Sequence, residues 1–187
     1  MPKQSTELMI KHTADLIVSC INNNFNDAKN AIERGANVNM RLAQHLNPEM
    51  LGYPPYTNEP AIVYALNKGK EKIVELLLEN NANFESRDNR GRTPLMIAAS
   101  HNFLEGVQML YTIGANINAH NTNKMDEYRS VINWGVYSHS IQMIELLIKL
   151  GAKVNESVLE CVQKEIKSNP TKMELKTIYE ILCNRVR

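Results

Sequence analysis

The fold is decided by residues 88–120, which read DNRGRTPLMIAASHNFLEGVQMLYTIGANINAH. Gly91 suits a tight turn, because glycine adopts a positive φ without steric strain. Thr93 can cap a helix, and Pro94 is favoured as the first residue of that helix. The stretch therefore predicts a helix that begins at Pro94.

A second helix is predicted to follow and to stop at Gly114, because glycine commonly ends helices. Its apolar residues recur at helical spacing and would form one stripe. Two helices this short cannot bury their apolar faces alone, so the pair must stack on copies of itself. The stripe of the second helix consists of Leu104, Val107, Leu110 and Tyr111.

The copies are recognised by their endings. The ending at 114–118, Gly-Ala-Asn-Ile-Asn, has counterparts at 35–39, 81–85 and 151–155. The step from the counterpart at 81–85 to 114–118 is one period of about 33 residues, as repeat proteins show. The other two steps are longer, so the sequence predicts four helix pairs with two insertions.

Residues 88–120 resemble one complete ankyrin repeat, although Met96 replaces the usual His. The resemblance implies an all-α solenoid of stacked helix-turn-helix units with short β-hairpin or loop fingers and a C-terminal helical cap. The residues that carry the resemblance are Gly91, Thr93-Pro94-Leu95, Ala98-Ala99, Val107, Leu110, Gly114-Ala115 and Asn118.

The implied organisation is a single ankyrin-repeat domain over 1–187. Its expected parts are repeat 1 at about 5–39, an insertion at 40–58, repeat 2 at about 59–87, repeat 3 at 88–120, repeat 4 at about 121–157, and capping helices at 158–187. For the start of repeat 1, the sequence permits either a separate helix capped by Ser5 or one continuous helix up to Asn22.

Composition excludes several classes of partner. A net charge of +1 gives no basic stripe for nucleic acid or for an anionic membrane, and no apolar stretch is long enough to span a membrane. Cys20, Cys161 and Cys183 form no CxxC pair, which favours a reducing compartment. We therefore expect a cytoplasmic protein, or one acting in a host cytosol if it is a secreted effector.

No motif for catalysis, cofactor binding or metal binding is found. His45 and Glu49 are separated by Pro48, so they do not share a helical face as a zinc-binding HExxH motif requires. Gly69-Lys70 lacks the upstream glycines of a phosphate-binding loop. We expect no cofactor, no metal and no enzymatic activity.

The insertion at 40–58 is the most individual segment of the sequence. It carries apolar and aromatic residues where ankyrin proteins have a short finger, and such clusters often mark interaction surfaces. The alternative is that the segment covers the imperfect junction between repeats 1 and 2. Its candidate partner-binding residues are Leu46, Met50, Tyr53 and Tyr56.

The resemblance implies a second binding surface, because ankyrin proteins usually bind partners with finger tips and the exposed face of each first helix. Trp134 falls at a stacking position and is expected in the core, with a role as a binding anchor as the alternative. Asn118 and Asn155 match the position that the family's asparaginyl hydroxylase modifies, although the same residues also suit the turn. The matching partner-binding positions are Lys68, Asn89, Arg90, Arg92, His101, Tyr128, Arg129 and Tyr137.

These observations predict a monomeric, non-catalytic protein-binding module, acting as an adaptor, inhibitor or host-targeting effector. The alternative is an enzyme, or a protein that regulates one, with its site in the insertion or in the divergent repeat 4. His45, Glu49, His101 and His139 would be the candidate residues for that alternative.

Overall fold

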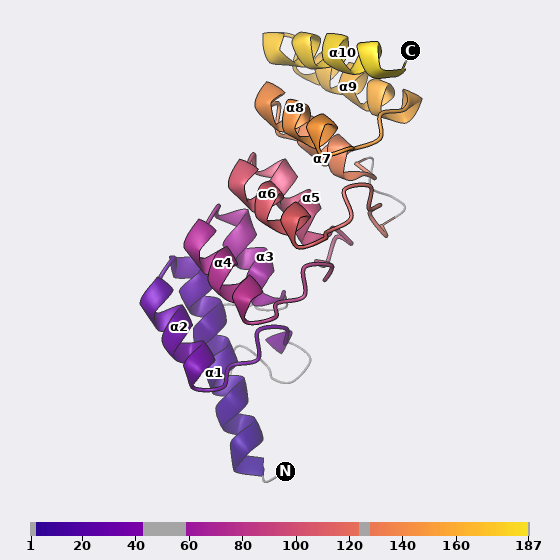
Figure 1. Cartoon of the computed structure of the whole chain (residues 1–187). Helices are drawn as coiled ribbons and strands as arrows, with labels where there is room; N and C mark the ends of the chain where they lie inside the picture. The colour runs from indigo at the N-terminus through magenta and orange to yellow at the C-terminus, as the bar shows by residue number, and fades with distance from the viewer. Residues whose placement is uncertain (1–2, 43–58, 124–127, 187) are drawn as a thin grey trace. The chain divides into compact units, whose positions relative to one another are not determined.

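The computed structural model describes residues 3–42, 59–123 and 128–186. The regular elements found in these ranges are α-helices, accompanied by one isolated antiparallel bridge between His120 and Ser130. Contacts divide the chain into two units, Met1–Asn89 and Arg90–Arg187. Figure 1 shows the helices of each unit in chain order.

Unit 1 contains two helix pairs. The first helix packs on the second and the third, and the second packs on the fourth. The first is one continuous helix, which settles the choice that the sequence left open at Ser5. Cys20 lies in its buried face, where burial raises the pKa of the thiol to about 12. The four helices are α1 (Lys3–Asn22), α2 (Phe25–Glu33), α3 (Ala61–Asn67) and α4 (Glu71–Glu79).

Unit 2 contains three helix pairs, built on the same principle. The first helix of each of the first two pairs makes contacts on two sides: α5 packs on α6 and α7, and α7 packs on α8 and α9. The last pair, α9 and α10, packs together at the carboxyl end. The six helices are α5 (Pro94–Ser100), α6 (Leu104–Thr112), α7 (Val131–Tyr137), α8 (Ile141–Lys149), α9 (Glu156–Ser168) and α10 (Met173–Val186).

The start of α5 confirms the turn and cap expected from residues 88–120. Gly91 has a φ of +80°, and the Thr93 hydroxyl accepts a hydrogen bond from the Met96 N–H at 3.4 Å. Pro94 occupies the first turn, where its missing N–H is not needed. Asn81, which takes the place of glycine after α4, has a left-handed φ of +62°, a conformation that asparagine tolerates.

Gly91 is constrained more tightly than Gly114, although both have a positive φ. A Cβ at Gly91 would lie 2.9 Å from the backbone nitrogen of Asn123, whereas a Cβ at Gly114, where φ is +100°, would meet nothing within 4 Å. We expect Gly114→Ala to lower the free energy of unfolding by about 1 kcal/mol from backbone strain alone. Gly91→Ala should add a clash and lower it by about 2–4 kcal/mol. Urea denaturation followed by circular dichroism measures both variants, and equal losses would contradict the packing around Gly91.

Candidate protein-binding site

Helix α7 holds the chain's single tryptophan in a fixed position. Ser130 caps the helix: its hydroxyl accepts from the Asn133 N–H at 3.4 Å, and the Asn133 side-chain oxygen accepts from the Ser130 N–H at 3.2 Å. This reciprocal pair defines where the helix begins. Trp134 follows directly and is 1% exposed, which confirms the expectation of a core residue.

Two arginines and two tyrosines surround Trp134. The guanidinium carbons of Arg90 and Arg92 lie 5.3 Å and 5.0 Å from the centre of its ring, within the range of cation–π attraction. The rings of Tyr128 and Tyr137 have centroids 5.2 Å and 5.8 Å from the Trp134 ring. We call these five residues the arginine–aromatic cluster.

Within the cluster, the two tyrosines also contact one another. Their centroids are 5.3 Å apart with the planes at 76°, which is the edge-to-face arrangement that aromatic rings favour. Each such aromatic pair contributes about 0.5–1.5 kcal/mol beyond the burial of area. The five side chains therefore hold one another in place.

The cluster has a buried floor and an exposed upper part. Trp134 and Arg92 are 1% and 8% exposed, whereas Tyr137 is 51% exposed and Arg90 is exposed as well. A rigidly supported aromatic ring beside a guanidinium is a frequent anchor in protein interfaces, because little side-chain freedom is lost on binding. The arrangement can therefore recognise a partner without covalent chemistry.

A polar network connects the cluster to the carboxyl-terminal helix pair. The Tyr128 hydroxyl donates to one carboxylate oxygen of Glu165, and the other oxygen lies 2.9 Å from His139 Nε2. Lys172 Nζ lies 2.7 Å from His139 Nδ1. Because an ammonium only donates, Nδ1 accepts and Nε2 carries the proton that His139 donates to Glu165.

The network keeps Glu165 ionised. Burial of the carboxyl group opposes ionisation, but hydrogen bonds from Tyr128, His139 and Asn169 outweigh it and lower the pKa of Glu165 below its ordinary value of 4.5. This geometry does not place His139 to activate a catalytic nucleophile, because its Nδ1 contacts the Lys172 ammonium rather than a hydroxyl or a thiol. The network thus orients Tyr128.

Acid should weaken unit 2 through Glu165. A carboxyl group whose pKa is lowered by folding stabilises the native state above its ordinary pKa of 4.5, and this contribution is lost as the pH falls through the lower native value. We expect Glu165→Gln to lower the free energy of unfolding by about 1–3 kcal/mol near pH 7, and the difference from the parent to shrink near pH 3. Urea denaturation at both pH values measures this difference, with the exposed Glu160→Gln as control. A difference that stays constant with pH would refute the role given to Glu165.

A family model described as ankyrin repeats (3 copies) matches residues 16–121, which is more than half of the chain. The chain belongs to the ankyrin repeat family. The predicted fold class, an all-α ankyrin-repeat fold, is therefore confirmed. Ankyrin repeats generally mediate binding between proteins and are generally non-catalytic.

Three relatives show how widely such repeats occur. The chain is 32% identical over 98 residues to alpha-latrotoxin-Lg1a of Latrodectus geometricus, covering 51% of the chain and 7% of the toxin. It is 31% identical over 109 residues to a putative ankyrin repeat protein of Acanthamoeba polyphaga mimivirus, covering 58% of the chain and 14% of the viral protein. It is 33% identical over 98 residues to the B-cell lymphoma 3 protein homolog of Mus musculus, covering 52% of the chain and 21% of the mouse protein. The chain thus spans at most about a fifth of the length of these relatives.

The ankyrin loops are joined by asparagine side chains in both units. Asn39 donates to Asn81 O at 3.0 Å and accepts from the Asn83 N–H at 2.7 Å. Asn118 makes the equivalent pair with Gly151 O at 3.3 Å and the Lys153 N–H at 2.8 Å. Each side-chain amide therefore links one loop to the next. This link explains the presence of asparagine at these positions better than its preference for turns does.

The two asparagines proposed for hydroxylation have different roles in this ankyrin chain. Asn118 joins two loops, as described above, and Asn155 caps α9 by accepting from the Val158 N–H at 3.2 Å. Hydroxylation of either residue stays a prediction.

Four of the partner-binding positions predicted for repeats 3 and 4 come together in the arginine–aromatic cluster, namely Arg90, Arg92, Tyr128 and Tyr137. His101 is exposed at the end of α5, with its ring nitrogen 3.0 Å from Ile97 O, and Arg129 is exposed beside Tyr128 in the chain. Lys68 is exposed in unit 1. The predicted residues Leu46, Met50, Tyr53 and Tyr56 lie outside the described residues, as do His45 and Glu49.

Asn89, another predicted position, belongs to a contact that sequence reasoning missed. Arg41 Nη1 lies 3.1 Å from Glu59 Oε2 and 3.3 Å from Asn89 Oδ1, and Arg41 also donates to Arg87 O. The Asn89 N–H donates to Glu59 at 2.8 Å. Burial raises the pKa of Glu59 although Arg41 lies beside it, so the ion pair adds little net stability. Its main effect is to hold Arg41, Glu59 and Asn89 in position. The only feature of the sequence that could have indicated this contact is the pair of opposite charges, Arg41 and Glu59, at the two ends of the insertion.

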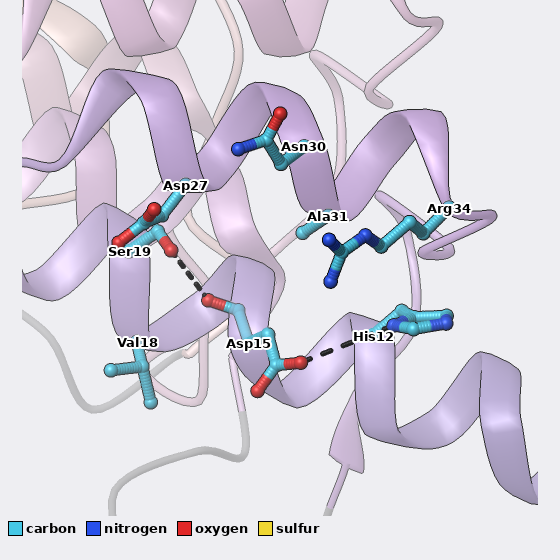
Figure 2. A pocket seen from close by; sticks show the side chains of 8 residues that line it. All are labelled: His12, Asp15, Val18, Ser19, Asp27, Asn30, Ala31 and Arg34. Atoms are coloured by element: carbon cyan, nitrogen blue, oxygen red, sulfur yellow. Dashed lines mark hydrogen bonds and ion pairs between the residues drawn. The ribbon is translucent and has the colours of Figure 1, made fainter.

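A depression of about 300 Å³ lies between α1 and α2 of unit 1, as Figure 2 shows. Its lining mixes the carboxylates of Asp15 and Asp27 with the Arg34 guanidinium and His12, whose Nδ1 is 4.0 Å from Asp15 Oδ2. This mixture favours no single charge of ligand. Within the described residues, no group of three or more His, Cys, Asp or Glu could hold a metal ion, and no helix is both long and apolar enough to cross a membrane.

Proposed function

We propose that the chain is a non-catalytic protein-binding module whose partner anchors on the arginine–aromatic cluster. One observation carries this proposal: the half-exposed Tyr137 ring rests edge-on against the buried Trp134, beside the guanidinium of Arg90. Tyrosine and arginine are enriched at the energetic centres of interfaces, particularly where packing already fixes them. The general role of ankyrin repeats in protein binding supports the same function.

The test compares capture of proteins by the intact chain and by two variants with matched exposure. Tyr137→Ala removes the exposed ring of the cluster, whereas Tyr111→Ala removes a tyrosine that is 39% exposed on α6, away from the cluster. Both variants should melt within a few degrees of the parent, since neither ring is buried. Immobilised proteins are incubated with cell lysate, and bound proteins are quantified by mass spectrometry.

The proposal expects a set of proteins that the parent and Tyr111→Ala retain equally and that Tyr137→Ala loses by about tenfold, as for an interface anchor of at least about 1.4 kcal/mol. Arg90→Ala, which removes the exposed guanidinium of the cluster, should lose the same set of captured proteins. Capture that is unchanged in both cluster variants would refute an anchor at this site.

The segment 43–58 is proposed as a second contact, on the strength of its sequence alone. It contributes Leu46, Met50, Tyr53 and Tyr56, and apolar residues of this kind are common in interfaces. Replacing 43–58 by a glycine–serine segment of equal length keeps Arg41 and Glu59 in place. Weaker capture at an unchanged melting temperature would support the contact, whereas a lower melting temperature would support the structural alternative. Light scattering on the parent tests the proposal that it is a monomer.

A further inference from the structure

We propose that a groove between α8 and α10 is a further docking surface, and that it takes a segment of another protein in which an aliphatic side chain adjoins a carboxylate. The groove has a volume of about 490 Å³ and lies within unit 2. It shares no residue with the arginine–aromatic cluster. We call it the α8–α10 groove; its lining consists of Glu145, Ile148 and Lys149 from α8 and of Ile181 and Arg185 from α10.

Two isoleucines give the α8–α10 groove an apolar floor. Ile148 and Ile181 are each half-buried, so part of their surface stays in contact with water between the two helices. An aliphatic side chain placed against them is stabilised by roughly 25 cal/mol for each Å² of apolar surface removed from water. The volume falls within the range of about 300–1,000 Å³ that binding pockets show, which leaves room for such a side chain and its neighbours.

Two cationic side chains lie in the same groove. Lys149 is the last residue of α8, and Arg185 lies in the last turn of α10. Both are exposed, and within the described residues neither side chain forms an ion pair or a hydrogen bond. A carboxylate that enters from solvent therefore reaches both cations without displacing an existing partner.

Glu145 gives the groove a direction. It precedes Lys149 by four residues, so the two lie on one face of α8 a single turn apart. At that spacing they could pair, but the part of the chain that the structure describes contains no ion pair between them. An incoming carboxylate is thus attracted at the end formed by Lys149 and Arg185 and repelled at the Glu145 end, which fixes how an acidic segment lies.

A protein segment suits the α8–α10 groove better than a free fatty acid or a membrane. Pockets for small ligands bury most of the ligand, whereas both cations of this groove are exposed. Anionic membranes recruit clusters of about four to eight basic residues, and this groove offers two beside a glutamate. Ankyrin repeats generally mediate binding between proteins, which agrees with this choice.

The test follows the methyl groups of Ile148 and Ile181 by NMR in the intact protein, labelled with carbon-13 at the isoleucine δ-methyl positions. Ile148→Val and Ile181→Val assign the two resonances. The probe is a short blocked peptide that repeats Ala-Leu-Glu-Glu. Matched probes carry glutamine in place of glutamate or alanine in place of leucine, and decanoate represents a free amphipathic acid.

The proposal expects both methyl resonances to shift with the leucine–glutamate peptide and to shift much less with either changed peptide. Lys149→Gln and Arg185→Gln should each weaken binding about two- to fivefold, and Glu145→Gln should strengthen it about twofold, as expected for exposed charges. The control is Lys167→Gln, which removes an exposed lysine from the last turn of α9 and should leave binding unchanged. All four variants should melt with the parent, because the replaced side chains are exposed.

Four outcomes would overturn the inference. They are methyl resonances that do not move at millimolar peptide, charge variants that bind as the parent does, larger shifts with decanoate than with the peptide, and a mass that rises with concentration in light scattering unless Lys149 is replaced. The third would indicate a free fatty acid, and the fourth a second copy of the chain. Tyr137→Ala should leave peptide binding unchanged, so the α8–α10 groove and the proposed function are tested separately.

Discussion

Leu110→Asp is expected to unfold unit 2. Leu110 is completely buried in α6, so an aspartate at this position would lie away from solvent. Burying an unpaired carboxylate costs about 4 kcal/mol or more, which is a large part of the roughly 5–15 kcal/mol that stabilises an ordinary domain. Far-UV circular dichroism and thermal melting should show a weakened or absent cooperative transition.

The control for this variant is its neighbour on the same helix. Tyr111→Asp places the same charge at a residue that is 39% exposed, and it should change stability by less than about 1 kcal/mol. Cooperative melting of Leu110→Asp at the parent's temperature, or intact partner capture by that variant, would contradict the packing of α5 and α6.

Trp134→Ala is expected to produce the second largest loss, of about 3–5 kcal/mol in the free energy of unfolding. The substitution leaves a cavity beneath α7 and removes the ring on which Arg90 and Arg92 stack. Trp134→Phe keeps most of the side-chain volume, so its loss in the free energy of unfolding should be less than half of the loss for Trp134→Ala. Urea denaturation followed by circular dichroism measures both, because the alanine and phenylalanine variants have no tryptophan fluorescence.

Stability and binding should separate within the cluster. Tyr137 is 51% exposed and contacts two rings, so Tyr137→Ala should lower stability by about 1–2 kcal/mol, clearly less than Trp134→Ala, while it reduces partner capture about tenfold. If Trp134→Ala changed stability by less than about 1 kcal/mol, the buried ring would not be the support of the site that its contacts indicate.

The repeated pattern made the helix pairs predictable. Thr93, Pro94 and Gly91 each impose a local conformation, and the apolar stripes then leave one way to bury both helices of a pair. The start of α1 was less determined, because Ser5 can cap a helix and can equally lie within one. The structure shows one continuous helix, whose first turns around Ser5 and Leu8 are exposed.

Repeat correspondence predicted four members of the arginine–aromatic cluster but not its centre. Arg90, Arg92 and Tyr137 were named because equivalent positions face partners in other ankyrin proteins, whereas Trp134 was expected in the core, with a role as a binding anchor as the alternative. The sequence does not show that guanidinium groups from before α5 stack on a ring from α7. Contacts between residues so distant in the chain depend on how neighbouring pairs pack.

The polar network was unpredictable for a related reason. Glu165 lies in α9, which has no counterpart in the repeat pattern, and its partner Tyr128 precedes α7 in the least regular repeat. Nothing local in the sequence relates Glu165 to His139, which sits in a turn with a φ of +54°. Only the folded unit brings these groups within hydrogen-bonding distance.

The contact of Arg41 with Glu59 also determines how freely the insertion can change. The pair and its bonds to Arg87 O and Asn89 bring the two ends of 43–58 together through groups that belong to unit 1 itself. The entropy of closing a chain segment whose ends are already fixed depends only weakly on its length, by about 0.6 kcal/mol for each doubling. The entropy of closure therefore sets little limit on the length of the segment between these ends, so this position suits the grafting of a foreign peptide if replacement of 43–58 leaves the melting temperature unchanged.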